Sequence, residues 1–234
     1  MWGRDTHSAF LRSMYMKKLT IFLVMSIFAF GLFAIDMSVG GGFAVSPSFY
    51  TVSTTFEETT VKASTQQGNV NVYGFFDATY VEASVGLLFG FPSVKMNVAV
   101  DGFGGFSEEE TFDGFSSMGL SIAAMGKYPI ALGKVIISPM AGIEYNLNLS
   151  YKMDGEDVKE FMDDDSKANL NDLWFKLGAS ADFAITESVF IRPVALFAIG
   201  AKKKVEEIDI PGVDINISQF NYKFDIGCSV GFKL

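Results

Sequence analysis

The sequence predicts an all-β protein, an eight-stranded antiparallel up-and-down transmembrane β-barrel that is preceded by a cleaved signal peptide. Three observations predict it: long stretches in which apolar and polar residues alternate, a regular alternation of long and short connections, and an N-terminal export signal. The composition fits strands with one apolar and one polar face, because 24 Phe and 23 Gly occur beside 27 acidic residues in 234.

The N-terminal segment has the layout of a secretory signal peptide. Lys17 and Lys18 give a positive start, residues 19–33 form an uncharged apolar run, and Ala34 is a small residue suited to cleavage. The run is shorter than the roughly twenty residues that a membrane anchor needs, which is the alternative interpretation. We expect residues 1–34 to combine an over-extended start with the signal peptide, with the true start at Met16 and cleavage near Ala34.

The remaining residues, 35–234, form the expected barrel domain, and their last segment is the clearest strand. From position 219 to position 234 every second residue is apolar. A row of this length next to polar residues is typical of a strand between lipid and a polar lumen. The apolar row consists of Phe220, Tyr222, Phe224, Ile226, Cys228, Val230, Phe232 and Leu234.

Seven further strands follow from the same period of two, and the connections between all eight alternate in length. The expected strands are 35–45, 70–77, 81–90, 117–127, 134–147, 173–185, 189–201 and 219–234. The expected long connections are 46–69, 92–116, 148–172 and 202–218, and the short ones are 78–81, 128–133 and 185–188. This alternation places the long loops at one rim and the tight turns at the other, as in outer-membrane barrels.

Charged residues at inward positions are the first candidates for a functional site. Charges in a narrow lumen are costly unless they are paired, so we expect an ion-pair network that plugs the barrel. A gated ion path is the alternative. The inward charges are Asp77, Glu82, Glu144, Lys176, Asp182, Arg192, Lys223 and Asp225.

The third long connection is acidic, and we interpret it as a solvated surface loop. Clustered carboxylates can bind calcium, but the spacing here matches no EF-hand. The same interpretation holds for Glu108, Glu109 and Glu110, so no metal site and no cofactor are expected. The acidic residues are Asp154, Glu156, Asp157, Glu160, Asp163, Asp164, Asp165 and Asp172.

Enzymatic activity is not expected. His7, the only histidine, lies in the segment that is removed, so a serine–histidine mechanism lacks its base. Cys228 is expected to face lipid, where a thiol does not ionise readily. Nucleic acid is also disfavoured as a partner, because the net charge of −9 falls to −12 once residues 1–34, with four basic residues and one acidic residue, are removed.

Aromatic residues near the ends of the expected strands are candidates for the girdles that anchor a barrel at the two membrane surfaces. They are Phe43, Tyr73, Phe89, Phe91, Tyr128, Tyr145, Phe183, Phe190, Phe197 and Tyr222.

Two stretches resemble the family of small outer-membrane β-barrels, the OmpA/OmpX/OmpW-like group. Residues 178–197 (GASADFAITESVFIRPVALF) are similar to the strand–turn–strand hairpins of that family, in which inward residues such as Asp182 and Arg192 pair. Residues 226–234 resemble its C-terminal assembly signal, carried by Phe232 and Leu234, although many members end in Phe. The resemblance implies a location in the bacterial outer membrane, contact with its lipid, and recognition by the barrel-assembly machinery. A monomer is expected.

Three hypotheses about function follow. The first is a structural or surface-interaction protein with a plugged lumen and long acidic extracellular loops that meet an extracellular or host ligand. The alternative is a small pore or hydrophobic-ligand channel of the OmpW type. The third is a soluble periplasmic barrel that binds lipid in the manner of a lipocalin.

Overall fold

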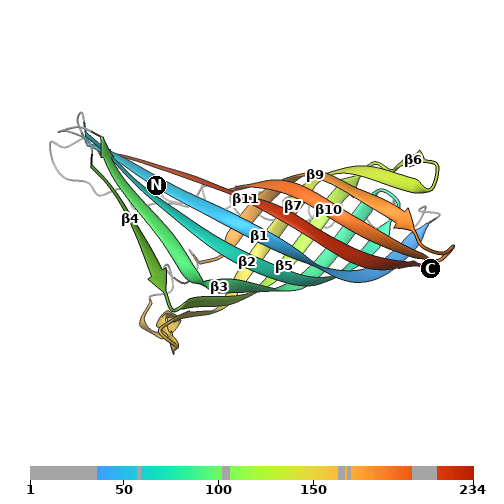
Figure 1. Ribbon diagram of the computed structural model, residues 1–234, viewed down its shortest axis with the longest axis horizontal. Helices are drawn as coiled ribbons and strands as arrows, with labels where there is room; N and C mark the ends of the chain where they lie inside the picture. The colour runs from blue at the N-terminus through green and yellow to red at the C-terminus, as the bar shows by residue number, and fades with distance from the viewer. Residues whose placement is uncertain (1–35, 57–58, 102–105, 163–166, 168–169, 202–214) are drawn as a thin grey trace, which may run out of the picture.

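The computed structural model describes residues 36–56, 59–101, 106–162, 167, 170–201 and 215–234. Eight of its strands form a closed antiparallel ring (Figure 1) in the order β2-β1-β11-β10-β9-β7-β5-β3, and pairing of β2 with β3 closes it. These strands are β1 (Met37–Phe56), β2 (Thr59–Ala78), β3 (Val81–Asp101), β5 (Phe115–Lys127), β7 (Val135–Met153), β9 (Asp172–Ala184), β10 (Val189–Gly200) and β11 (Ile215–Lys233). The predicted antiparallel up-and-down barrel is confirmed.

Three shorter strands and a 3-10 helix extend this ring within the described residues. β4 (Phe106–Asp113) pairs with β3, whereas β6 (Ile130–Leu132) and β8 (Glu156–Asp157) both pair with β7. The 3-10 helix η1 (Val158–Phe161) follows β8. The predicted signal peptide lies outside the described residues.

The strands form where apolar and polar residues alternate, because each strand then has one face for lipid and one for the lumen. In β11, Lys223 and Asp225 are buried inside the ring, while Phe224, Ile226 and Phe232 between and beyond them are exposed on its outside. A closed ring also leaves no open sheet edge along its wall, as a hydrocarbon environment requires.

Among the described residues, no helix is long and apolar enough to cross a membrane.

One end of the ring, here called the turn end, carries the tight connections. Thr79, which has a positive φ of 31°, lies between β2 and β3, and Gly133, with φ of 65°, lies between β6 and β7. Residues 185–188 connect β9 to β10. The last residue is also held here, because the backbone N–H of Leu234 donates to the carbonyl oxygen of Met37 at 2.9 Å. The opposite end is called the loop end.

The predicted long connections are wrong in large part, because strands continue into them. β1 and β2 remain paired as far as Phe56 and Thr59, inside the expected loop 46–69. β3 and β4 occupy most of 92–116, β7 extends to Met153, and β11 begins at Ile215. Threonine and valine in these stretches favour strands. Outside the lipid a strand does not need one apolar face, so the alternation of apolar and polar residues is lost there. Residues 202–214 lie outside the described residues.

The continued strands make the barrel asymmetric. β1, β2 and β3 each have 20 or 21 residues, whereas β10 on the other side has 12. We call the continued part the outer sheet: residues 47–56 of β1, 59–68 of β2, 94–101 of β3, all of β4, and 215–221 of β11. It projects past the rim on one side of the loop end (Figure 1).

A break in strand pairing marks the base of the outer sheet. Gln67 pairs with Val94, but Asn69 pairs with Gly90, so β3 uses two more residues than β2 here. Pro92 lies in this bulge, and a proline is tolerated there because the position has no partner on β2 that needs its N–H, which proline lacks.

Candidate functional site

All eight charged residues that were predicted to point inward lie inside the barrel, where they form two ion-pair clusters. The turn-end cluster contains Asp77, Glu82, Asp182 and Arg192, and the structure adds Lys127 to it. The loop-end cluster contains Glu144, Lys176, Lys223 and Asp225. The two clusters use residues from seven of the eight ring strands.

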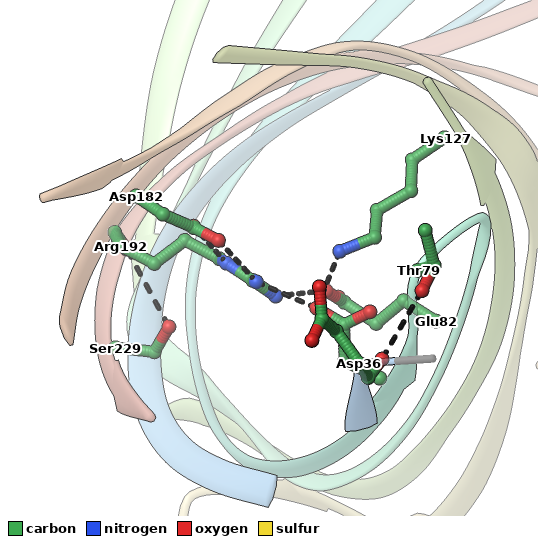
Figure 2. Close-up of polar contacts among 8 residues, drawn as sticks. Asp36, Thr79, Glu82, Lys127, Asp182, Arg192 and Ser229 are labelled. Atoms are coloured by element: carbon green, nitrogen blue, oxygen red, sulfur yellow. Dashed lines mark hydrogen bonds and ion pairs between the residues drawn. The ribbon is translucent and has the colours of Figure 1, made fainter. Parts of the chain in front are cut away.

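Arg192 is the centre of the turn-end cluster (Figure 2). From β10 its Nη1 lies 2.5 Å from Glu82 Oε2, and its Nη2 lies 2.6 Å from Asp77 Oδ2. Its Nε lies 2.5 Å from Asp182 Oδ1 on the neighbouring strand β9. Because β10 and β3 are four strands apart in a ring of eight, the pair of Arg192 with Glu82 crosses the lumen from one wall to the opposite wall.

Lys127 was not predicted to belong to this site. Its ammonium group contacts Asp77, so it is the second cation among three carboxylates. The signal was present in the sequence, because Lys127 continues the inward row of Ser121, Ala123 and Met125 in β5. It was missed because it is the last residue of its strand.

Two neighbouring aromatic rings, of Phe75 and Phe190, pack against the Arg192 guanidinium. Its central carbon lies 4.9 Å from the ring centroids of both Phe75 and Phe190, a distance at which cation–π attraction operates. Glycine makes room for these rings: a Cβ at Gly231 would lie 2.1 Å from Phe190 Cζ. Phe190 is 3 % exposed, so its predicted place in a membrane-surface girdle is wrong.

Glu144 is the centre of the loop-end cluster. Here the central group is an anion between two cations, whereas in the turn-end cluster the central group is a cation. Glu144 Oε2 accepts a hydrogen bond from Lys176 Nζ at 2.6 Å, and Glu144 Oε1 accepts one from Lys223 Nζ. Lys176 Nζ also lies 2.5 Å from Asp225 Oδ2. Trp174 covers this cluster on the loop-end side, with Lys223 Nζ 5.0 Å from its ring centroid.

The space between the two clusters is small. Met125, Met140 and Leu196 pack together there as a buried apolar group. The cavity that Glu82 and Glu144 both line has a volume of about 50 Å³, which is room for one or a few water molecules. Tyr73 lines this cavity as well, so its predicted place in a girdle is also wrong.

A larger cavity, the outer vestibule, opens above the loop-end cluster. Its volume is about 260 Å³, and Lys223 and Trp174 form part of its wall. Sequence reasoning did not predict this cavity, because it depends on which strands stand opposite one another. Its polar wall residues are Ser46, Ser48, Tyr50, Thr65, Gln67, Asn69, Ser117, Asn146, Asn148, Tyr151 and Asp172.

The acidic loop beyond β7 is only partly described, since residues 163–166 fall outside the described ranges. Asp157 accepts a hydrogen bond from the backbone N–H of Lys159 at 3.0 Å and thereby caps η1. This hydrogen bond holds the pKa of Asp157 below its ordinary value. Within the described ranges, no group of three or more His, Cys, Asp or Glu residues is arranged to hold a metal ion.

The remaining predicted residues lie in β11 and after its end. Cys228 is a free, half-buried thiol in the outward row of β11. Phe232 is 51 % exposed and Leu234 76 %, so both are accessible at the turn end. Their role as an assembly signal stays a prediction.

Comparisons with known proteins give likenesses only to solved structures. No family model and no curated protein matches this sequence. The Neisserial surface protein NspA is 11% identical, with 82% of this chain and 97% of that chain covered and a TM-score of 0.37. The outer membrane protein OprG of Pseudomonas aeruginosa is 12% identical, with coverage of 85% and 95% and a TM-score of 0.38.

A third solved structure is an enzyme, the outer membrane protease OmpT of Escherichia coli. It is 9% identical, with 86% of this chain and 98% of that chain covered and a TM-score of 0.37. The expectation that this chain is not an enzyme stays a prediction. The closed antiparallel ring and the apolar exterior of the chain itself have the architecture of a small β-barrel of the bacterial outer membrane.

Proposed function

We propose that this protein is a closed outer-membrane barrel with a structural or surface-interaction role, in which the two charge clusters block the lumen and the outer sheet faces the cell exterior. One observation carries the proposal. The turn-end and loop-end clusters are stacked along the lumen, and each joins strands that are not neighbours in the ring.

The geometry of the ion pairs supports a blocked lumen. Arg192 bridges opposite walls, and the rings of Phe75 and Phe190 fill the space beside it. Lys223 from β11 reaches Glu144 on β7, three strands away. An ion could pass only if these buried pairs separated, and separation would leave charges unpaired in a narrow interior, which is costly.

The shape of the wall supports a role outside the membrane. A span of the hydrocarbon core takes about 9–11 residues of a tilted strand. The 20 residues of β1 and of β2 are roughly twice that number. The excess forms the outer sheet, whose Thr51–Ser64 and Thr55–Thr60 side-chain hydrogen bonds suit a hydrated surface.

Single-channel recording in planar lipid bilayers tests the blocked lumen. We expect no stepwise conductance from purified protein in neutral buffer. Stable conductance steps that scale with protein concentration would overturn the proposal and favour the small-pore alternative.

Labelling of intact cells tests the orientation. In a Cys228→Ser background, Thr111→Cys places a thiol on the exposed strand β4, and the matched variant Leu132→Cys places one on β6 at the turn end. A membrane-impermeant maleimide should label Thr111→Cys on intact cells, but Leu132→Cys only after the outer membrane is opened. The reverse pattern would contradict the proposed exposure of the outer sheet.

A further inference from the structure

We propose that the outer vestibule binds one small, neutral, polyhydroxylated molecule of the size of a sugar ring. This inference goes beyond the proposed function, because it concerns only the pocket above the loop-end cluster. It does not depend on whether the lumen conducts.

The lining of the outer vestibule consists mainly of neutral hydrogen-bonding groups. Amides come from Gln67, Asn69, Asn146 and Asn148, which lie on β2 and β7. Hydroxyl groups come from residues of β1, β2, β5 and β7, namely Ser46, Ser48, Tyr50, Thr65, Ser117 and Tyr151. Such a lining can form many hydrogen bonds with an uncharged polar ligand, both as donor and as acceptor.

The charged groups of the vestibule already have partners inside the protein. Lys223 is held by Glu144 of the loop-end cluster. Asp172 accepts a hydrogen bond from the hydroxyl of Tyr50 at 3.4 Å. An ionic ligand would have to compete with these contacts, whereas a neutral ligand can use the amides and hydroxyls without disturbing them.

Three polar atoms of lining residues are buried and have no hydrogen-bond partner within the described part of the chain, and a turn of these side chains toward the vestibule would let a ligand pair with them. The three atoms are Oδ1 of Asn146, Oδ1 of Asn148 and Nε1 of Trp174. Asn146 is 8 % exposed and Trp174 is 1 % exposed. Buried groups of this kind are costly when unpaired, so each calls for a partner.

The chemistry of these three atoms selects the ligand class. The two amide oxygens accept hydrogen bonds and the indole N–H donates one, so the ligand must offer both donors and acceptors. Hydroxyl groups do both, and several of them on one small molecule could serve all three atoms. A simple alcohol or an apolar molecule of the same size would leave most of them unpaired.

The outer vestibule is preformed and of limited size. Asn69 Nδ2 donates to Ser48 Oγ on the neighbouring strand β1 at 3.1 Å, and Gln67 Nε2 donates to Ser117 Oγ on β5 at 3.4 Å, so contacts with other strands fix these side chains. The volume of about 260 Å³ is below the range of about 300–1,000 Å³ that is usual for pockets of drug-sized ligands. A single ring fits this volume better than a large ligand does.

Tryptophan fluorescence tests the proposal at the site itself. The chain has two tryptophans, Trp2 and Trp174, so Trp2→Phe in the full chain leaves Trp174 as the sole reporter. We expect D-glucose, D-galactose or N-acetyl-D-glucosamine to produce a saturable change in its emission at millimolar concentrations. Cyclohexanol, with one hydroxyl on a ring of similar size, should give no saturable change.

A matched pair of variants shows whether the vestibule is responsible. Asn146→Ala removes an unpartnered acceptor from the vestibule, and Asn71→Ala removes one from the small cavity between the clusters. We expect Asn146→Ala to weaken sugar binding about five- to tenfold, the effect of one lost hydrogen bond, and Asn71→Ala to change it less than about twofold. Heat-modifiable gel migration of each variant establishes that it is folded, and calorimetry gives the affinity without relying on fluorescence.

Two outcomes would overturn the inference. One is the absence of saturable binding for all three sugars in the folded protein, which would mean that water alone satisfies the vestibule. The other is an equal loss of binding in Asn146→Ala and Asn71→Ala. If the single sugars bind, maltotriose distinguishes two kinds of ligand. Maltotriose that binds as tightly as a single sugar, or more tightly, indicates that the ligand is the end of a surface glycan. Maltotriose that does not bind indicates a free monosaccharide.

Discussion

The two charge clusters fill the same lumen with opposite chemistry. At the turn end one guanidinium, from Arg192, is surrounded by three carboxylates. At the loop end one carboxylate, from Glu144, lies between two ammonium groups. The central residue sets how many oppositely charged groups a cluster can hold. An arginine has five N–H donors in a planar fork, whereas a glutamate offers two oxygens.

The surroundings of the two clusters differ as well. The adjacent rings of Phe75 and Phe190 both pack against Arg192. The loop-end cluster has Trp174 above it and then the outer vestibule. We therefore expect the turn-end cluster to contribute more to the stability of the barrel, and the loop-end cluster to form the floor of a pocket.

The largest expected effect is that of Arg192→Met. The substitution leaves Asp77, Glu82 and Asp182 facing a single cation, Lys127, and loss of one partner from buried ion pairs costs about 3–5 kcal/mol. Urea unfolding in lipid vesicles measures the free energy of unfolding, with Ile191→Met on the outward face as the control. A loss below about 1 kcal/mol would place Arg192 in a hydrated, screened site instead.

A smaller loss is expected for Glu144→Gln. The amide keeps the shape of the side chain but removes the charge between Lys176 and Lys223, which leaves Asp225 as their only described anion. Hydrogen bonds to charged groups are worth about 1.5–3 kcal/mol, so the loss should fall in that range. The same unfolding measurement checks it. A loss equal to that of Arg192→Met would remove the proposed difference between the clusters.

Asp182→Asn should have a still smaller effect. Its side chain lies near the mouth of the turn end and is 15% exposed. The amide oxygen can still accept a hydrogen bond from Arg192, and the substitution leaves two carboxylates with two cations, so the loss should be below about 1.5 kcal/mol. Urea unfolding of Asp182→Asn and Arg192→Met under the same conditions compares their losses in free energy of unfolding. A larger loss for Asp182→Asn than for Arg192→Met would contradict the assignment of Arg192 as the centre of the turn-end cluster.

The smallest effect is local and depends on pH. Folding lowers the pKa of Asp157 below 3.8 because its carboxylate accepts the backbone N–H of Lys159. The capping contribution is therefore present above pH 3.8 and is lost as the pH falls through the lowered value. The protection of the Lys159 amide against exchange, measured by NMR in detergent relative to the intrinsic rate at each pH, should fall only in that acidic range. Asp157→Asn, which keeps an acceptor oxygen, should abolish this pH dependence.

The inward and outward faces of the strands could be predicted from the sequence. The period of two was sufficient to place Arg192, Glu144 and the other six charges inside, because a strand inside a membrane must keep its lipid face apolar. The same rule applied to the ends of strands would also have placed Lys127 and Trp174 inside.

The grouping into clusters and the outer sheet could not be predicted. Arg192 and Glu82 are separated by 110 positions, so their contact depends on ring closure and on register, which the period of two does not encode. The outer sheet was missed because outside the lipid both faces of a strand can be polar. Its threonines and valines carried only the weaker signal of strand propensity.

Single-channel recording of charge-balanced truncations tests whether the two stacked clusters each block the lumen. Arg192→Ala with Asp182→Ala shortens the turn-end cluster and keeps its net charge, and Glu144→Ala with Lys223→Ala does the same at the loop end. We predict no conductance for the unaltered protein and for either pair, and stepwise conductance for all four substitutions together in protein that still shows heat-modifiable migration. Conductance of the unaltered protein would contradict the claim that the clusters block the lumen. A folded quadruple variant without conductance would contradict it as well.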